Sequence, residues 1–275
     1  MRIQSVFSLS VLIAFVIVIL FPIYWMVMTA ILPTDQILSR NPTLIPNPAD
    51  VSLSAFFAVF ERRPFHLWMA NSFGIALTTT VLSLVAATLA GYSLSRWHRK
   101  PQQLLGASLL ISKLIPASLI IIPLFIVFNV INLIDSYVGL VLASMTVGVP
   151  LATWLMKGFF DRIPRELEQS AMIDGCSELQ ALRYVVLPLA KPGLGASAIY
   201  LLIVSWSEFI FARTLITSED RTLLTVGLQS FVGEYVVDWS SLMAAGTISL
   251  LPVMILFVVL EPFLVSGMTK GALAN

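Results

Sequence analysis

Long apolar stretches interrupted by few charged residues dominate the pattern of this chain. No charged residue lies between Arg2 and Asp35, or between His66 and Arg96. A helix needs about 20 mostly apolar residues to cross a bilayer. The apolar runs predict six transmembrane helices, at about residues 7–31, 70–95, 104–130, 137–157, 193–216 and 241–264. These runs are too long and continuous for barrel strands, and lipid cannot satisfy open backbone groups. We therefore expect an all-α polytopic membrane protein.

The composition supports this class and excludes others. Hydrophobic residues make up 58% of the 275 residues and charged residues 11%, whereas about 25% of an ordinary soluble domain is charged. A soluble globular enzyme, a disordered chain and a collagen-like fibre are therefore excluded. The net charge of +1 provides no basic field for nucleic acid. The single cysteine, Cys176, excludes an intrachain disulfide, and two histidines leave little for a metal site.

Lysine and arginine are distributed unevenly over the predicted loops, and cytoplasmic loops carry an excess of both. If both termini are cytoplasmic, ten of these residues lie inside and five outside, with Lys113 within a helix. The distribution therefore predicts six spans with both termini in the cytoplasm. The five outer residues are Arg40, Arg62, Arg63, Arg213 and Arg221.

The inner loop of residues 158–192 carries the most local structural signals. Pro164 suits the first turn of a helix, and Gly175 can adopt the left-handed conformation that ends one. Ser177 can then cap a second helix, because Gln180 follows three residues later as in a capping box. Three apolar residues at helical spacing give this second helix an apolar stripe, namely Leu179, Leu182 and Val186.

This loop is predicted to form a short helix, a glycine elbow and a second amphipathic helix on the membrane surface, ended by Leu187 and Pro188. Small residues at Ser170 and Ala171 would let a partner surface approach closely, which suits a mechanical coupler. The alternative is an amphipathic connection without a partner, since helix caps and proline stops are common.

The run of residues 168–192 resembles the EAA loop of binding-protein-dependent ABC importer permeases. That loop has Glu-Ala-Ala, then glycine, then Leu-Pro about a dozen residues later, and Gly175, Leu187 and Pro188 match this spacing. Other segments resemble the carbohydrate branch, in particular its second, maltose-type permease subunit. They are residues 71–72, 91–96, 206–209, 222–223, 227–229, 242–246 and 267–272, whereas the last three residues, 273–275, depart from that branch.

The resemblance, which extends over essentially the whole chain, implies a type I ABC importer permease fold. It implies a single transmembrane permease domain over residues 1–275, with core helices at about 70–265 and a coupling loop at about 160–192. The implied function is import of a carbohydrate or related polar solute across a bacterial or archaeal inner membrane. The chain would be a transport subunit and not an enzyme.

The implied partners are a second permease subunit, two ATPase subunits, an extracytoplasmic solute-binding protein and the lipid membrane, without nucleic acid. ATP and magnesium would be bound by the ATPase subunits. This chain would bind no cofactor, and its sequence lacks the Gly-x-x-x-x-Gly-Lys-Ser/Thr motif of a nucleotide site.

The resemblance also implies which residues meet the ATPase. The family's Glu-Ala-Ala is Gln169, Ser170 and Ala171 here, so the carboxylate that usually meets a basic residue of the ATPase is missing. Glu168, one residue earlier, is the expected substitute. The full set of residues expected in coupling is Glu168, Gln169, Ser170, Ala171, Asp174, Gly175, Leu187 and Pro188. No catalytic residue and no metal ligand is expected.

Lys113 and Glu208 are charged side chains in the interior of predicted spans, where charge is costly and usually faces a cavity or a partner. Lys113 either lines a cavity or extends to the cytoplasmic surface. Glu208 either lines the solute path, as its segment does in the resembled family, or pairs with Arg213. Trp206 either offers its apolar face to a sugar or anchors a helix end. The expected path residues are Glu208, Trp206, Ser207 and Lys113.

The sequence leaves alternative functions to be weighed against that of an importer subunit. A stand-alone secondary transporter or channel is disfavoured by the coupling-type loop and by the lack of an evident inverted repeat. An intramembrane enzyme is disfavoured because neither Gly-x-Ser-x-Gly nor His-Glu-x-x-His occurs. Within the importer class, a glycerol phosphate or a polyol is an alternative solute to a sugar.

Overall fold

The computed structural model describes residues 2–39, 43–233 and 235–272, without the side chains of residues 2–7 and 260–272. Residues 273–275, whose sequence differs from that of the maltose-type branch, therefore lie outside the described residues. The side chains of residues 267–272 also lie outside them. The chain divides into two compact units. The first comprises Met1–His66 and Val226–Pro252, and the second comprises Leu67–Thr225 and Val253–Asn275.

The first unit contains one long apolar helix with smaller elements around one of its ends. Near that end, Met28, Leu32 and Ile37 form a small buried cluster, and the Ser52 amide donates to the carbonyl of Ile31. The elements are α1 (Arg2–Ile31), α2 (Thr34–Ile37), α3 (Ser54–Arg62), the 3-10 helix η3 (Leu228–Phe231) and the first part of α14 (Trp239–Ala272).

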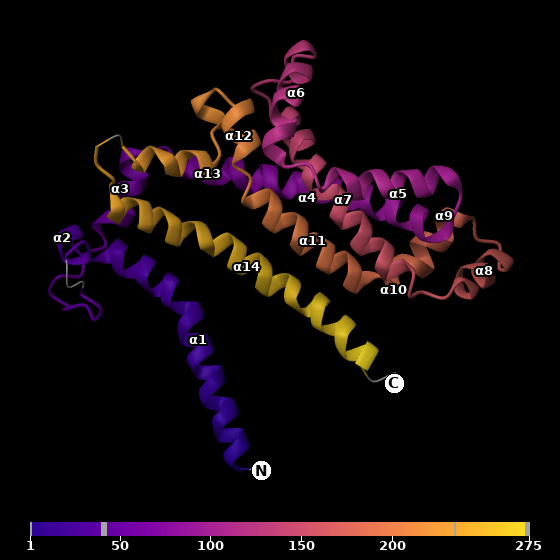
Figure 1. Ribbon diagram of the computed structural model, residues 1–275, viewed down its shortest axis with the longest axis horizontal. Coiled ribbons are helices and arrows are strands. Elements are labelled where there is room, and N and C mark those ends of the chain that lie inside the picture. The colour runs from indigo at the N-terminus through magenta and orange to yellow at the C-terminus, as the bar shows by residue number, and fades with distance from the viewer. Residues whose placement is uncertain (1, 40–42, 234, 273–275) are drawn as a thin grey trace. The chain divides into compact units, whose positions relative to one another are not determined.

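The second unit is a helical bundle in which α7 and α11 lie side by side (Figure 1). Its membrane-type helices are α4 (Phe65–Arg96), α5 (Lys100–Ser112), α6 (Ala117–Val130), α7 (Tyr137–Phe160) and α11 (Lys191–Trp206). The inner loop forms α8 (Arg165–Ile173), α9 (Glu178–Ala181), the π-turn η1 (Leu182–Val186) and α10 (Leu187–Leu189). After α11 come α12 (Ile210–Leu215), η2 (Glu219–Arg221) and α13 (Leu224–Gly227).

Small residues let the helices of this bundle approach closely, as is common in membranes. A Cβ added to Gly91 of α4 would lie 2.9 Å from the Lys157 amide nitrogen and the Thr153 carbonyl oxygen of α7. A Cβ added to Gly148 of α7 would lie 2.7 Å from the side chain of Leu201 in α11. Glycine at these two positions therefore sets the spacing of α4, α7 and α11.

Among the described residues, four helices are long and apolar enough to cross a membrane by themselves: Ser8–Ile31, Phe65–Arg96, Tyr137–Phe160 and Trp239–Val259. Two further candidates are bent pairs. The chain bends by 110° between Lys100–Ser112 and Ala117–Val130, and by 80° between Glu178–Leu189 and Lys191–Trp206. The prediction of six spans therefore applies only if each bent pair is counted as one span.

Two predicted helices are interrupted where continuous spans were expected. The third, at residues 104–130, breaks before Pro116, which caps α6 and restricts the preceding residue to extended conformations. The fifth, at residues 193–216, ends at Trp206 and resumes as the short α12. Glu208 therefore lies in a helix break and not inside a span, which corrects its expected position.

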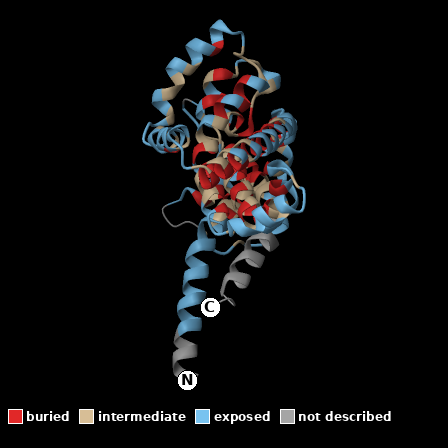
Figure 2. Ribbon diagram, turned by 90° about the vertical axis from the view of Figure 1, so that its right-hand side faces the viewer, coloured by how far each residue is buried: buried red, intermediate tan, exposed pale blue. Residues whose placement is uncertain are grey.

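Many helical residues are exposed (Figure 2), and a large share of them are apolar. Residues 8–24 of α1 are exposed throughout, and exposed apolar side chains also line α4, α6 and α14. Contiguous apolar surface on this scale is rare on soluble monomers. Together with the span lengths, it fits a protein whose helices are covered by lipid or by other membrane proteins.

Candidate functional site

The inner loop has the predicted helix–elbow–helix form. Gly175 adopts a φ of +96° directly after α8. Its amide donates to the carbonyl of Met172, and the Cys176 amide donates to that of Ala171. These two bonds form a Schellman motif, which satisfies carbonyls at the helix end. The next helix begins with the predicted capping box between Ser177 and Gln180.

The second helix of the loop differs in part from the prediction. Of the three residues in the predicted apolar stripe, Leu182 and Val186 are buried in the protein, whereas Leu179 is 69% exposed. Leu187 and Pro188 do not end the helix, which continues to Leu189. The wider π-turn just before Pro188 shifts the hydrogen bonds, so that the helix passes a residue that lacks an amide hydrogen.

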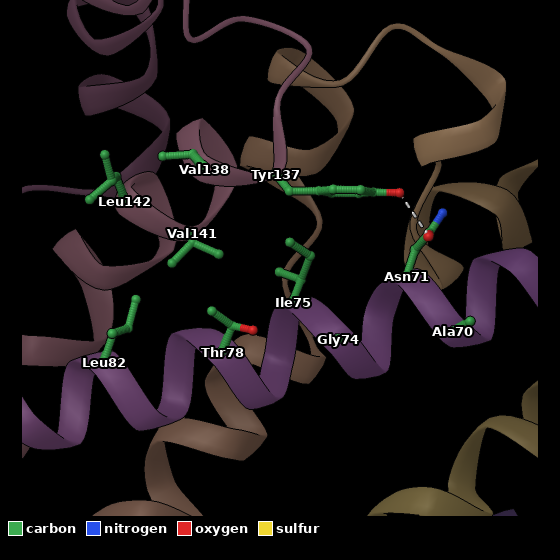
Figure 3. Close-up of a pocket in the computed structure, with 10 residues that line it drawn as sticks. All are labelled: Ala70, Asn71, Gly74, Ile75, Thr78, Leu82, Tyr137, Val138, Val141 and Leu142. Atoms are coloured by element: carbon green, nitrogen blue, oxygen red, sulfur yellow. Dashed lines mark hydrogen bonds between the residues drawn. The ribbon is translucent and has the colours of Figure 1, made fainter.

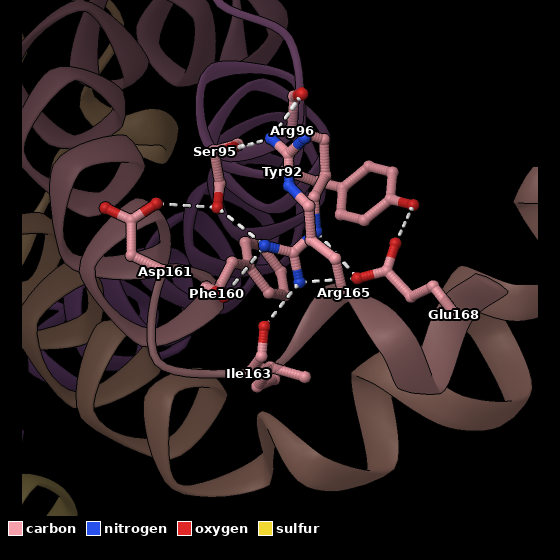
Figure 4. Close-up of polar contacts among 8 residues, drawn as sticks. All are labelled: Tyr92, Ser95, Arg96, Phe160, Asp161, Ile163, Arg165 and Glu168. Atoms are coloured by element: carbon pink, nitrogen blue, oxygen red, sulfur yellow. Dashed lines mark hydrogen bonds and ion pairs between the residues drawn. The ribbon is translucent and has the colours of Figure 1, made fainter. Parts of the chain in front are cut away.

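Glu168 is buried, which contradicts its expected role as an exposed carboxylate. Its residue exposure is 6%, and its Oε1 atom lies 2.6 Å from Arg96 Nε and 2.5 Å from Arg96 Nη2. The Tyr92 hydroxyl donates to Oε2 at 2.7 Å (Figure 4). The carboxylate thus points into the protein, where a charge must be paired and hydrogen-bonded. It does not substitute for the glutamate that Gln169 replaces.

Arg96 holds three segments together through its guanidinium group. Nη1 donates to the carbonyl of Phe160 at 3.0 Å, and Nη2 donates to that of Ile163 at 3.2 Å (Figure 4). Arg165 of α8 donates in turn to the Ser95 carbonyl at 3.0 Å and to the Arg96 carbonyl at 2.5 Å. These carbonyls belong to the last turn of α4, which has no intrahelical donors for them.

Asp161 extends the polar cluster toward the membrane helices. It accepts hydrogen bonds from Ser95 and from Lys157, each at 2.6 Å. Burial by itself would raise the pKa of the Asp161 carboxyl, but these two bonds and the charges of Lys157 and Arg96 together outweigh it and lower the pKa. The group therefore remains ionised at neutral pH and ties the end of α7 to the end of α4.

An apolar cluster supports the polar one. Tyr92 packs edge-on against the rings of Trp97 and Phe160, with ring centroids 5.7 Å apart in each pair. Tyr92 and Phe160 share a buried core with Leu182 and Val186 of the second loop helix and with Ala190 just after it. The elbow and its second helix are therefore fixed on the bundle by side chains from α4 and α7.

The outer face of α8 is accessible. Gln169, Ser170, Asp174 and Gly175 are exposed, and Ala171 is half-buried. Pro188 is also exposed, and Leu187 is half-buried. Ile173 is 86% exposed, although it is not among the residues that the sequence led us to expect in coupling. It lies at the end of a mostly polar helix, just before the Asp174-Gly175 pair, and this place in the sequence was the available signal.

The expected path residues cluster only in part. Trp206, Ser207 and Glu208 lie together at the break after α11. The Phe211 amide donates to Glu208 Oε1 at 2.6 Å, which satisfies an amide in the first turn of α12. The salt bridges of the described residues do not join Glu208 to Arg213. The expected alternative of an ion pair with Arg213 is therefore wrong.

Lys113 lies at the other helix break, between α5 and α6. Its ammonium group donates to the carbonyl of Val147 in α7, and to the Tyr200 hydroxyl of α11 at 3.3 Å. The Lys113 side chain thus extends across the bundle toward α7 and α11. Tyr200 is six residues before Trp206, which is about 9 Å along a helix axis.

Hydrogen bonds join segments at the opposite end of α4. Asn71 donates to the carbonyls of Asp220 and Thr222 at 2.8 and 3.0 Å, and the Leu224 amide donates to Ser72. The Tyr137 hydroxyl donates to Asn71 at the rim of a mostly apolar cavity of about 440 Å³ (Figure 3). Residues 71–72 and 222–223 resemble the carbohydrate branch as separate segments of the sequence, and the fold brings them into contact.

Asp135 fixes the loop before α7 to the segment after α12. Its backbone has a φ of +54°, and its carboxylate accepts bonds from the Ser218 hydroxyl and from the amides of Thr217 and Ser218. Led by the Ser218 hydroxyl, these bonds and the charge of Arg221 lower the pKa of Asp135 to about 2.

These features define a class of protein, a multi-span helical membrane component with one structured polar loop fixed to its bundle. The chain belongs to the family of binding-protein-dependent transport system inner membrane components, which it matches over residues 80–270.

Curated relatives cover most of the chain. It is 33% identical to the sulfoquinovosyl glycerol transport system permease protein SmoH of Agrobacterium fabrum, over 92% of this chain and 88% of that protein. It is 32% identical to the diacetylchitobiose uptake system permease protein DasC of Streptomyces coelicolor, over 92% and 91%. It is 34% identical to the maltodextrin transport system permease protein MdxG of Bacillus subtilis, over 80% of each chain.

Solved structures share the fold. A chain of a bacterial ABC transporter involved in the import of the acidic polysaccharide alginate has a TM-score of 0.80 at 23% identity, over 95% of this chain and 96% of that one. A chain of a bacterial alginate ABC transporter in complex with an alginate pentasaccharide-bound periplasmic protein has a TM-score of 0.68 at 13% identity, over 94% and 92%.

The Asp135 contacts predict a pH-dependent contribution to stability. Because the folded pKa lies below the ordinary value of 3.8, the stabilisation is fully present above about pH 4 and is lost as the pH falls through about 2. Asp135→Asn tolerates the left-handed backbone but removes the charge. We expect it to lower the free energy of unfolding by about 1–3 kcal/mol at pH 6, and by progressively less below pH 4.

Unfolding of the purified protein in detergent, followed at several pH values, measures this difference. Asp220→Asn is the control, because it changes an exposed carboxylate and leaves in place the Asp220 carbonyl that Asn71 contacts. A pH-independent cost of Asp135→Asn would show that the ionised carboxylate is not the stabilising group.

Proposed function

We propose that this chain is a permease subunit of an ATP-driven ABC importer, with α8 as the helix that docks on a cytoplasmic ATPase. The observation that carries the proposal is an exposed short helix, ended by a left-handed glycine and fixed to the membrane bundle by buried polar contacts. Membership of the binding-protein-dependent transport family supports it. ATP hydrolysis would take place on the partner subunits and not on this chain.

The proposed contact between α8 and the ATPase does not depend on an ion pair. Gln169 cannot replace a carboxylate, and Glu168 is turned inward. Ser170 and Ala171 leave room for close approach, and the exposed Ile173 offers apolar contact area. Shape and apolar burial would therefore carry the contact, with Asp174 as the nearest exposed charge.

We further propose a heteromeric complex in which this chain forms half of the solute path. The other components would be a second permease, two ATPase subunits and an extracytoplasmic solute-binding protein. A periplasmic protein is present in one structural relative. The solute class proposed is a carbohydrate, supported by relatives named for sulfoquinovosyl glycerol, diacetylchitobiose and maltodextrin transport.

The proposed orientation has both termini in the cytoplasm, because ten basic residues lie on that side and five on the other. Reporter fusions at Asn47 and at Gly175 should then report opposite sides of the membrane. A periplasmic signal from Gly175 would place α8 out of reach of any ATPase and overturn the docking proposal.

Gly175→Val tests the elbow. Nothing lies within 4 Å of an added Cβ, so the cost comes from the backbone. A left-handed residue with a Cβ costs about 1–2 kcal/mol, and a β-branched one costs more. We expect Gly175→Val to abolish solute-stimulated ATP hydrolysis in the reconstituted complex while membrane insertion survives.

Gly175→Asn is the matched control, because asparagine tolerates positive φ, and it should retain most of the stimulation. Gln169→Ala should have a milder effect than Gly175→Val, since Gln169 carries no charge. Full solute-stimulated ATP hydrolysis by the Gly175→Val complex would show that the loop only connects two helices and does not couple to the ATPase.

Glu208→Gln tests the solute path. Glutamine keeps an oxygen that can accept the Phe211 amide, so that α12 stays capped while the charge is lost. We expect impaired or altered solute transport by an intact complex. Glu219→Gln, which changes an exposed carboxylate of the next segment, should leave transport unchanged. Wild-type uptake of every transported solute by the Glu208→Gln complex would remove Glu208 from the path.

A further inference from the structure

The attachment of α8 to the membrane bundle depends on very few side chains. All nine residues of α8 are described, and Glu168 is the one among them that is buried. Leu167, Met172 and Ile173 are all at least 40% exposed. The helix therefore has little apolar packing of its own, and the polar contacts of Glu168 and Arg165 anchor it to α4.

The contacts of that carboxylate have a fixed geometry. Arg96 meets Glu168 with two nitrogen atoms, and the same guanidinium group reaches the carbonyls of Phe160 and Ile163. Arg165, one helical turn before Glu168, bonds back to the carbonyls at the end of α4. Two side chains three residues apart lie on the same face of a helix. They fasten this face of α8 to the last turn of α4 from two sides.

We propose that the buried Arg96–Glu168 pair, closed by Tyr92, is the joint through which a displacement of α8 is transmitted to α4. The inference rests on the proposed docking of α8 on an ATPase. A docking helix held only by exposed apolar residues would rock on the bundle, and movement of the partner would be lost in that rocking. A planar guanidinium group bonded to a carboxylate and to two backbone carbonyls fixes both distance and orientation.

The placement of the pair fits this role. Arg96 is the last residue of a helix of 32 residues, which spans about 48 Å at 1.5 Å per residue. A small rotation applied at Arg96 is therefore carried along the whole of α4, to Asn71 and Ser72 near its other end. There α4 is hydrogen-bonded to residues 220–224. Arg96 and Glu168 are thus positioning residues that contact neither solute nor nucleotide.

Glu168→Gln is the test, because it keeps the size and the hydrogen-bonding shape of the side chain and removes its charge. Glu166→Gln is the matched control, with the same chemical change two residues away at an exposed position of the same helix. Both variants are assembled into the complete complex with its binding protein and reconstituted in vesicles. Two quantities are measured, namely the amount of solute imported per ATP hydrolysed and the hydrogen exchange of the α8 amides.

We expect Glu168→Gln to accelerate exchange in α8 and to lower the import per ATP by about fivefold or more, the lower end of typical coupling between sites. ATP hydrolysis itself should continue, since the docking face is unchanged. Glu166→Gln should match the wild type in both quantities. Tyr92→Phe, which removes one hydrogen bond and leaves the ion pair, should give an intermediate loss. It also keeps the inference testable if the Glu168→Gln complex does not assemble.

Wild-type import per ATP in both Glu168→Gln and Tyr92→Phe, or in Tyr92→Phe alone if Glu168→Gln does not assemble, would overturn the inference. An equal loss of hydrolysis and import, with unchanged exchange in α8, would assign the pair to fold stability and also overturn it. The proposed function fails in a different way. It fails if the wild-type complex shows no solute-stimulated hydrolysis, or if Gly175→Val has no effect.

Discussion

The need to neutralise a buried carboxylate organises the loop of residues 158–192 and the helix ends next to it. Glu168 is withdrawn from solvent, and a charge in such a place persists only with a partner and further hydrogen bonds. Arg96 supplies both charge and geometry. Its remaining donors are taken by the Ser95 hydroxyl and by backbone carbonyls at the end of α7 and just beyond it. The end of α4, the end of α7 and the start of the loop are therefore fixed with respect to one another, and the elbow at Gly175 extends from this fixed base.

The breaks in the membrane helices have a related physical origin. A proline or a competing side chain removes or redirects backbone hydrogen bonds, and the freed groups need new partners within the bundle. Lys113 follows α5 at one break and bonds to α7 and α11, whereas Glu208 lies at the other and caps α12. Lys113 and Glu208, which were predicted to lie inside continuous spans, thus lie where helices end. This position reduces the cost of their charge.

Residues that are remote in the sequence and similar to one branch of a transport family also meet one another in space. Residues 91–96 contact the inner loop through Tyr92 and Arg96. Residues 71–72 contact residues 220–224 at the other end of α4. Three of these similar segments, residues 71–72, 91–96 and 222–223, therefore take part in two polar attachments of one long helix.

The sequence by itself determined the helical membrane class, the approximate positions of the apolar helices and the form of the inner loop. Each of these follows from local rules, because span length, helix caps and the left-handed preference of glycine act over a few neighbouring residues. The family resemblance on residues 168–192 was equally local. The same rules predicted an uninterrupted third span at about residues 104–130 and did not reveal its break before Pro116.

Only the tertiary structure decided which side of α8 faces inward. Glu168 and Gln169 are adjacent in the sequence and equally polar, yet one is buried and the other exposed, because the guanidinium group of Arg96 lies 72 residues away in the sequence and beside only one of them. The roles of Tyr92, Asp135 and Glu208 were decided in the same way. Their partners come from distant segments or from a helix break, and no local pattern encodes such a pairing.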